Sequence, residues 1–269
     1  MTTVLDLAAI KGRQQKTWAS GDYSAIGARI HPMAELLVQA ADLPAGARVL
    51  DVACGSGNAA LAAARCGCRV TGLDYVPELL DRARARSIAE GLPIQLERGD
   101  AEALPYPDGS FDAVLSVVGV MFAPNQERAA AELVRVCRPN GRIALASWTP
   151  DGFIGELFRT VGRHVAPPSG LRSPVEWGSE ARLRELLGRS VSVLTSMPRE
   201  FVFRFAGPED FVDFFRVNYG PTFTAFAGLG DDARAALYAD LVELARRHDS
   251  STNATLRIRA GYLETLATR

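Results

Sequence analysis

Little in the sequence points to a polyanion, a membrane or a secretory route. Thirty Lys and Arg residues nearly balance 31 Asp and Glu residues, the net charge is −1, and no long basic run occurs. Because binding to phosphate backbones depends on clustered positive charge, we expect no nucleic-acid partner. No signal peptide and no apolar run of membrane-spanning length is visible. We therefore expect a cytoplasmic protein with no membrane partner.

Cysteine and histidine are also scarce. Cys66 and Cys68 form a C-x-C pair, but no second pair or nearby histidine completes a zinc ligand set. We expect no metal site and reduced, mostly buried thiols. The three histidines include His31 and His164, which are the candidates for a catalytic general base. A surface or helix-capping role is the alternative for each of them.

The length of 269 residues and a hydrophobic content of 48% suit one large domain, or one domain with an elaboration. Strand and helix patterns alternate along the first part of the chain, which predicts an α/β fold with a parallel sheet covered by helices on both faces. The predicted elements are 48–53, 58–65, 69–74, 77–90, 94–98, 112–117, 126–137 and 141–147. Further on, we expect helices at 154–165, 180–187, 208–219 and 231–247 and extended segments at 191–195, 201–205 and 261–268.

The most informative segment is VLDVACGSG, residues 49–57. Its apolar residues predict a buried strand, interrupted by Asp51, whose burial would be costly without a partner or a role. Gly55 and Gly57 follow and allow a ligand to approach the backbone closely. A strand, an acid and a glycine turn leading into a helix indicate a nucleoside-cofactor pocket at the carboxyl end of the sheet. Residues 55–60 also match the G-x-G-x-x-A dinucleotide fingerprint, so a nicotinamide cofactor remains open at this point.

Two more acids follow the next two predicted strands. Asp74 is placed to accept hydrogen bonds from both hydroxyls of an adenosine ribose, and Asp100 from an adenine amino group. The alternatives are a helix N-cap for Asp74, a plain loop acid for Asp100, and a tight turn without a ligand for the two glycines. Because the carboxyl ends of parallel strands share one edge of the sheet, we expect Asp51, Asp74 and Asp100 to lie around one pocket.

Four segments in register carry a family resemblance: VLDVACGSG (49–57), VTGLDYVPELLDRAR (70–84), GDAEALPYPDGSFDAVLS (99–116) and ELVRVCRPNGRIALASW (132–148). With them the chain resembles the class I S-adenosylmethionine-dependent methyltransferases, in particular the ubiquinone and menaquinone biosynthesis enzymes. The resemblance implies S-adenosylmethionine as cofactor and a Rossmann-like, mostly parallel seven-stranded sheet with an antiparallel last strand and helical lid elements. Asn140 departs from the usual Pro-Gly-Gly turn, but asparagine tolerates the left-handed conformation, so we expect the turn to persist.

The resemblance also implies the organisation of the chain. Residues 1–44 would form an N-terminal helical lid and 45–150 the cofactor-binding core. Residues 151–269 would complete the same domain, with a helical insertion on the substrate side at about 206–250. The insertion could serve as a mobile lid or as the surface of a homodimer.

The site residues follow from these motifs and from the resemblance. For the cofactor we expect Tyr23, Asp51, Ala53, Gly55, Gly57, Asp74, Tyr75, Asp100, Ala101, Ser116 and Val117. For the substrate we expect Trp18, Met121, Phe122, Trp148 and Tyr219, although aromatic residues at helical spacing are more often plain core.

The interpretation favoured by the sequence is methyl transfer to an oxygen or carbon of a small, apolar or aromatic molecule, with substrate orientation as the main catalytic contribution. One alternative is a fold relative that binds the same cofactor and catalyses a rearrangement. Another is an NAD(P)-dependent oxidoreductase, for which no Tyr-x-x-x-Lys arrangement is present. A non-catalytic cofactor-binding module is the least favoured alternative.

Overall fold

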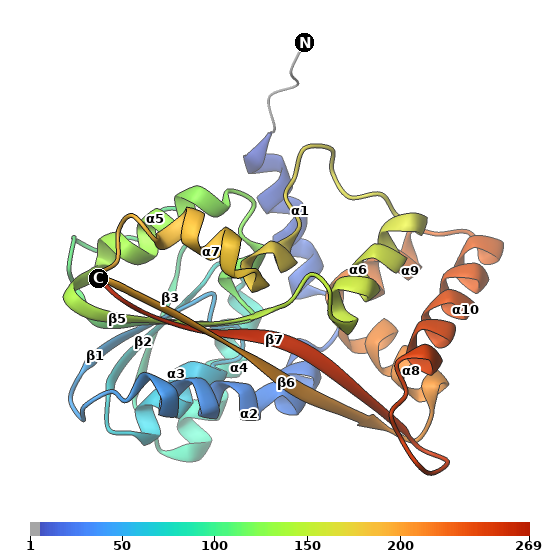
Figure 1. Ribbon diagram of the computed structural model, residues 1–269, viewed down its shortest axis with the longest axis horizontal. Coiled ribbons are helices and arrows are strands. Elements are labelled where there is room, and N and C mark those ends of the chain that lie inside the picture. The colour runs from blue at the N-terminus through green and yellow to red at the C-terminus, as the bar shows by residue number, and fades with distance from the viewer. Residues whose placement is uncertain (1–5) are drawn as a thin grey trace.

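The computed structural model describes residues 6–269, and its centre is a seven-stranded sheet (Figure 1). The strands are β1 (Arg48–Val52), β2 (Arg69–Asp74), β3 (Ile94–Arg98), β4 (Phe111–Val117), β5 (Cys137–Trp148), β6 (Val193–Phe205) and β7 (Leu256–Thr268). Their order is β3-β2-β1-β4-β5-β7-β6. The first five strands pair in parallel, whereas β7 runs antiparallel to both β5 and β6. This confirms the predicted Rossmann-like sheet with an antiparallel last strand.

Helices cover both faces of the sheet, as its buried central strands require. On one face lie α2 (Tyr23–Ala41), α3 (Asn58–Arg65) and α4 (Pro77–Glu90), and on the other lie α5 (Gln126–Val136) and α7 (Glu180–Leu187) (Figure 1). Val49, Leu50 and Val52 of β1 are fully buried between these layers. The strand is therefore apolar on both sides, which explains why Asp51 stands out within it.

The boundaries of α4 follow from its sequence. The helix begins at Pro77, has Glu78 in its first turn, and ends at Gly91 in the left-handed conformation. Asn140 also takes a left-handed conformation, with φ of 60°, which confirms the expected turn before the long part of β5.

The remaining elements precede the sheet, connect its strands or fill the segment before the last strand. α1 (Leu7–Ala19) precedes α2, and residues 1–5 of the predicted N-terminal lid lie outside the described part. The short 3-10 helix η1 (Val120–Phe122) follows β4, and α6 (Phe153–His164) follows β5. A second 3-10 helix, η2 (Pro174–Gly178), leads into α7. Three helices, α8 (Pro208–Asn218), α9 (Gly220–Ala227) and α10 (Asp231–Arg247), fill the segment between β6 and β7. Over residues 6–269, no helix is both long and apolar enough to cross a membrane.

The structure differs from the sequence-based expectation mainly in the last two strands. The separate extended segments expected at 191–195 and 201–205 are one strand, β6, which pairs with β7 along its whole length. Pro198 is tolerated inside β6 because this strand is at the edge of the sheet and has a free side. β7 also begins at Leu256, five residues before the expected 261. Long-range pairing with each other, not local pattern, sets the length of both strands.

Candidate functional site

The three acids expected around one pocket do lie at neighbouring strand ends. Asp51 is in β1, Asp74 is the last residue of β2, and Asp100 follows β3 by two residues. The first two side chains are almost fully buried, at 1% and 4% exposure. Because these carboxyl groups are buried away from bulk water, the groups around them influence their protonation.

Asp74 holds two loops at once. One carboxylate oxygen accepts the backbone N–H of Gly55 and the other accepts the backbone N–H of Val76, each at 2.9 Å. α4 has Val76 as its N-cap residue, with no side-chain cap bond, so the helix-cap alternative for Asp74 is excluded. Asp74 instead links the glycine turn after β1 to the loop after β2, and so sets the shape of the pocket between them.

Asp51 takes over the capping of α3. Gly57, the N-cap residue of this helix, has no side chain to offer, and a carboxylate oxygen of Asp51 accepts the N–H of Ala60 at 2.8 Å. Burial raises the pKa of Asp51 to about 8, although the bond from Ala60 opposes the shift. Burial likewise raises the pKa of Asp74 to about 6. Near neutral pH Asp51 is therefore mainly protonated, and a cation brought close to it would favour the ionised form.

The glycine turn brings the backbone close to its neighbours. Gly55 has φ of +55° and lies against the ring of Tyr23, whose nearest atom is 3.6 Å from where a Cβ would stand. Gly57 has φ of +85° and packs on Ala83 of α4. A side chain at either position would strain the backbone.

Three adjoining cavities open above this turn. The first, between β1, β2, β3 and α1, is lined by Gly55, Asp74, Tyr75, Asp100 and Ala101, among others. The second lies at the glycine turn and is lined by Asp51, Cys54, Ser56 and Asn58. The third is almost entirely apolar and is lined by residues of α2, β5, β6, α6 and α8. Tyr23 and Val118 line all three cavities, so the three spaces meet between these two side chains.

The backbone is strained at this junction. Val118 has φ of 51°, an outlier for a β-branched residue, and Ala53 has φ of 55°. Gly119 is required beside them, because a Cβ there would come within 2.4 Å of the carbonyl oxygen of Ala53. Such strain persists where the surroundings impose it and is common at functional sites.

Most of the residues expected from the sequence line these cavities. They are Trp18, Tyr23, Asp51, Ala53, Gly55, Asp74, Tyr75, Asp100, Ala101, Val117, Phe122, Trp148 and Tyr219. Their roles remain predictions, but the fold brings these residues together from four strands, the loops that follow β1, β2 and β3, both N-terminal helices, η1 and the segment after α8.

The other expected site residues lie elsewhere. Gly57 and Met121 are packed behind the cavities. The Ser116 hydroxyl donates to the carbonyl of Val52 at 2.7 Å and accepts the N–H of Val120 at 2.8 Å, so the backbone already engages it. His31 pairs with Glu35 within α2 at 3.1 Å and His164 with Asp240 of α10 at 2.8 Å. Neither histidine lines one of the three cavities, so the geometry gives no support to a histidine base.

One face of α1 reaches the first cavity, and the sequence-based reasoning missed most of it. Lys11 pairs with Asp100 at 2.7 Å and also with Glu102. Gln14 donates to the carbonyl of Phe122 at 3.2 Å, and Gln15 donates to that of Tyr75 at 2.6 Å. The signal was present in the spacing: positions 11, 14, 15 and 18 follow the helical period and share one face.

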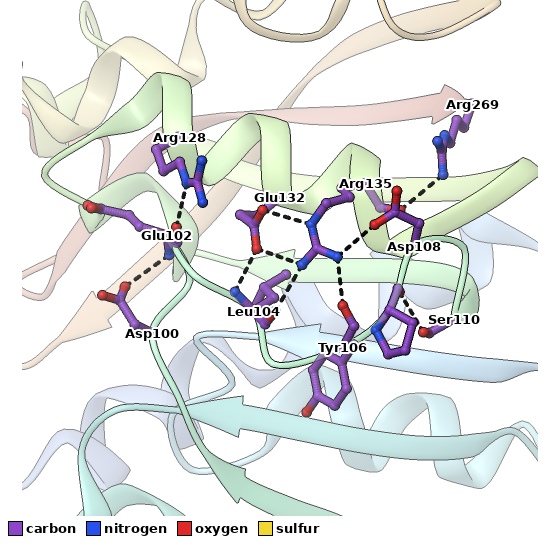
Figure 2. Close-up of polar contacts among 11 residues, drawn as sticks. Asp100, Glu102, Leu104, Tyr106, Asp108, Ser110, Arg128, Glu132, Arg135 and Arg269 are labelled. Carbon is purple, nitrogen blue, oxygen red and sulfur yellow. Dashed lines mark hydrogen bonds and ion pairs between the residues drawn. The ribbon is translucent and has the colours of Figure 1, made fainter.

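Arginine side chains hold the loop that carries Asp100, as Figure 2 shows. The guanidinium of Arg135 donates to the carbonyls of Tyr106 at 2.6 Å and Leu104 at 2.9 Å, and it pairs with Glu132 of the same helix. Glu132 in turn accepts the N–H of Leu104 at 2.7 Å. The loop after β3 is therefore anchored on α5, which fixes the outer wall of the first cavity.

Comparison with known proteins identifies the family. A family model described as a methyltransferase domain matches residues 50–145, which span β1 to β5. An uncharacterised protein of Mycobacterium tuberculosis is 44% identical over 241 residues, 86% of either chain. A demethylmenaquinone methyltransferase of Deinococcus radiodurans is 42% identical over 127 residues, 46% of this chain and 53% of the relative.

The chain belongs to the class I S-adenosylmethionine-dependent methyltransferases. The fold agrees: the structure of the YcgJ protein from Bacillus subtilis superposes with a TM-score of 0.62, covering 89% of this chain and 98% of that one, at 19% identity. The cofactor of this methyltransferase-family chain is S-adenosylmethionine.

The residues of the first two cavities fit that cofactor. The side-chain oxygen of Gln14 is buried without a hydrogen-bond partner among residues 6–269, so it can accept a bond from an amino or hydroxyl group. Asp74 and Asp100 add carboxylate acceptors to the lining of the first cavity. Asp51 adds a carboxyl group to the lining of the second.

Proposed function

We propose that the protein transfers the methyl group of S-adenosylmethionine to an oxygen or carbon atom of a small, apolar or aromatic molecule. One observation carries this proposal: the two cavities lined by the expected cofactor residues adjoin a third, apolar cavity at Tyr23 and Val118. A methyl group presented at that junction would face the third cavity directly. The cofactor supplies an electrophilic methyl group on a positively charged sulfur.

The apolar cavity indicates the kind of acceptor. Its walls include Trp148 of β5, Phe203 of β6 and Phe215 of α8, and its described lining contains no acid, histidine, lysine or arginine. An ionic acceptor would lose its hydration there without a partner, which is costly. A relative that matches part of the chain is named a demethylmenaquinone methyltransferase. That name agrees with an acceptor that has a flat, apolar ring.

The protein's own contribution is positioning and exclusion of water. Two tyrosines, Tyr23 and Tyr219, line the apolar cavity. Burial raises the pKa of both hydroxyls well above the ordinary value, so neither acts as a base near neutral pH. Alignment of two reactants in a closed site contributes about 7–11 kcal/mol in well-oriented systems. α1 and α2, within the N-terminal segment 1–44, and the helices of segment 206–250 would close over the reactants.

Calorimetric titration tests the cofactor part of this proposal. We expect micromolar-range affinity for S-adenosylmethionine and S-adenosylhomocysteine and none for NADH. Asp74→Ala should weaken binding by roughly 1–3 kcal/mol, because it removes an acceptor and releases the two loops that Asp74 holds. Asp81→Ala is the matched control, since Asp81 is an exposed acid on α4. Tight NADH binding would instead indicate an oxidoreductase.

Transfer of label tests the reaction. The protein is incubated with cofactor labelled on the methyl group and a panel of hydroxylated and non-hydroxylated aromatic compounds. We expect the label in an acceptor and S-adenosylhomocysteine as the second product. A changed acceptor that carries no label, with the cofactor intact, would show a rearrangement and refute methyl transfer.

A further inference from the structure

Two tyrosines bring hydroxyl groups to the third cavity, whose lining is otherwise apolar apart from the indole of Trp148. Tyr23 is the first residue of α2, and Tyr219 lies between α8 and α9, where its side chain is only 7% exposed. Both side chains line the cavity. Among residues 6–269 neither hydroxyl forms a hydrogen bond to a protein group, and both stay open to the cavity, since neither is among the enclosed polar atoms without a partner.

A hydroxyl that faces an apolar cavity gives up hydrogen bonds to bulk water, whereas phenylalanine would fill the same space without that cost. The two rings are also held in place. Trp18 of α1 packs edge-on against both, with ring centroids 5.5 Å from Tyr23 and 5.6 Å from Tyr219, and Phe215 packs against Tyr219 at 5.8 Å. The protein therefore fixes two hydroxyl groups in an apolar space and leaves their hydrogen bonds available.

We propose that the hydroxyls of Tyr23 and Tyr219 bind an oxygen substituent, a hydroxyl or carbonyl, on the aromatic ring of the methyl acceptor. This inference rests on the proposed function and assigns the acceptor class to the same site. Because Tyr23 also lines both cofactor cavities, an oxygen held there lies next to the junction where the methyl group must cross. The pair thus selects an oxygenated ring and sets its orientation.

The chemistry of the pair matches such an acceptor. Both phenols stay protonated near neutral pH, so each can donate to a carbonyl or phenolate oxygen and accept from a hydroxyl. The aromatic walls suit the faces of a ring. The cavity volume is about 20 Å³, room for little more than one water-sized group, so an acceptor ring must displace side chains or α1. Trp18 of α1 covers both tyrosines and would move with that helix.

The test compares two probes of nearly equal shape, 1-naphthol and naphthalene, on protein saturated with S-adenosylhomocysteine. The wild type should bind 1-naphthol about tenfold more tightly than naphthalene, as expected for one or two net hydrogen bonds. Tyr219→Phe should remove most of that preference by weakening 1-naphthol alone. It should leave naphthalene and S-adenosylhomocysteine affinities unchanged, because Tyr219 lines neither cofactor cavity.

Two further variants complete the experiment. Tyr23→Phe combined with Tyr219→Phe should abolish the preference for 1-naphthol. Tyr238→Phe is the control, because Tyr238 lies on α10 and lines none of the three cavities; it should behave as the wild type.

Three results would overturn the inference alone: equal affinity of the wild type for both probes, binding of neither probe, or a preference that survives in the double variant. Loss of the preference together with loss of S-adenosylhomocysteine affinity in Tyr219→Phe would also overturn it, since that result indicates a structural role. A wild-type protein that does not bind S-adenosylhomocysteine would refute the proposed function, and this inference with it.

Discussion

Cofactor affinity should rise with pH, because the buried acids beside the glycine turn must lose protons to face a cation. Burial raises the pKa of Asp51 to about 8 and that of Asp74 to about 6. Near neutral pH, Asp51 is therefore mainly protonated in the free protein. S-adenosylmethionine carries a positive sulfur, and a nearby positive charge favours the carboxylate form. Binding should then release a proton.

The magnitude follows from the ionised fraction of Asp51. With a pKa of about 8, that fraction is about one in a hundred at pH 6 and about one half at pH 8. If binding required a fully ionised Asp51, affinity would rise about 50-fold over this interval. Partial coupling still predicts a rise of about tenfold, with a plateau above pH 8. S-adenosylhomocysteine lacks the charge on sulfur, so its affinity should change less.

Isothermal titration at pH 6, 7, 8 and 9, in buffers of different ionisation enthalpy, measures both affinity and proton release. Asp51→Asn is the informative variant, since its side-chain oxygen can still accept the N–H of Ala60 while the titration is gone. Its affinity should be nearly independent of pH above 7, and Asp81→Asn should behave as the wild type. A wild-type affinity that is flat between pH 6 and 8, with no proton released, would refute this reasoning.

The raised pKa of Asp51 also makes the stability of the folded protein depend on pH. That pKa is higher in the folded state, about 8, than its ordinary value of 3.8, so between these values the folded protein binds more protons than the unfolded chain. The free energy of unfolding contributed by Asp51 therefore falls as pH rises from about 4 to about 8. Thermal unfolding without ligand should show Asp51→Asn gaining stability relative to the wild type across this window.

Three other predictions concern residues around the site. Arg135→Lys should lower S-adenosylhomocysteine affinity about three- to tenfold in titrations, because lysine cannot hold the Asp100 loop through several carbonyls at once. Unchanged affinity would show that cofactor binding does not depend on this anchoring of the loop. Arg48 and Arg138 hold the pKa of Asp112 well below its ordinary value of 3.8, so Asp112→Asn should lower the melting temperature by about 2–4 °C at pH 7. That contribution is present above the unfolded pKa of 3.8 and is lost as pH falls through the lower, folded pKa, so the difference between wild type and variant should shrink steadily below pH 3.8; a difference that stays constant there would contradict it. His31→Ala and His164→Ala should retain near-wild-type methyl transfer to any acceptor found by label screening. A loss of activity of 100-fold or more in either variant would indicate that this histidine acts as the base.

The cofactor half of the site could be predicted because its signals are local. Asp51 and Asp74 lie near the ends of strands whose apolar runs are visible in the sequence, Asp100 follows the next strand, and parallel strands place their carboxyl ends together. The partners of these acids could not be predicted in the same way. That Asp51 caps α3 and that Asp74 joins two loops depends on side-chain orientation after packing.

The residues of the acceptor half of the site could be predicted only in part. Trp148 and Tyr219 were expected at the substrate site and do line the apolar cavity, yet nothing local separates them from core residues such as Met121. His31 and His164 carried the right chemistry for a base but point to other partners. Chemical type alone does not place a side chain.

The sequence by itself determined the family, the cofactor turn and the order of strands and helices from β1 to β5, because hydrophobic period, glycine and strand-end acids act over a few residues. Tertiary structure alone decided which groups lie where the three cavities adjoin. Tyr23, Val118 and Tyr219 are far apart in the chain, and only the packing of α2 and α8 onto the sheet brings them together. The same holds for Lys11 and Gln14, whose role exists only once α1 lies across the ends of the strands.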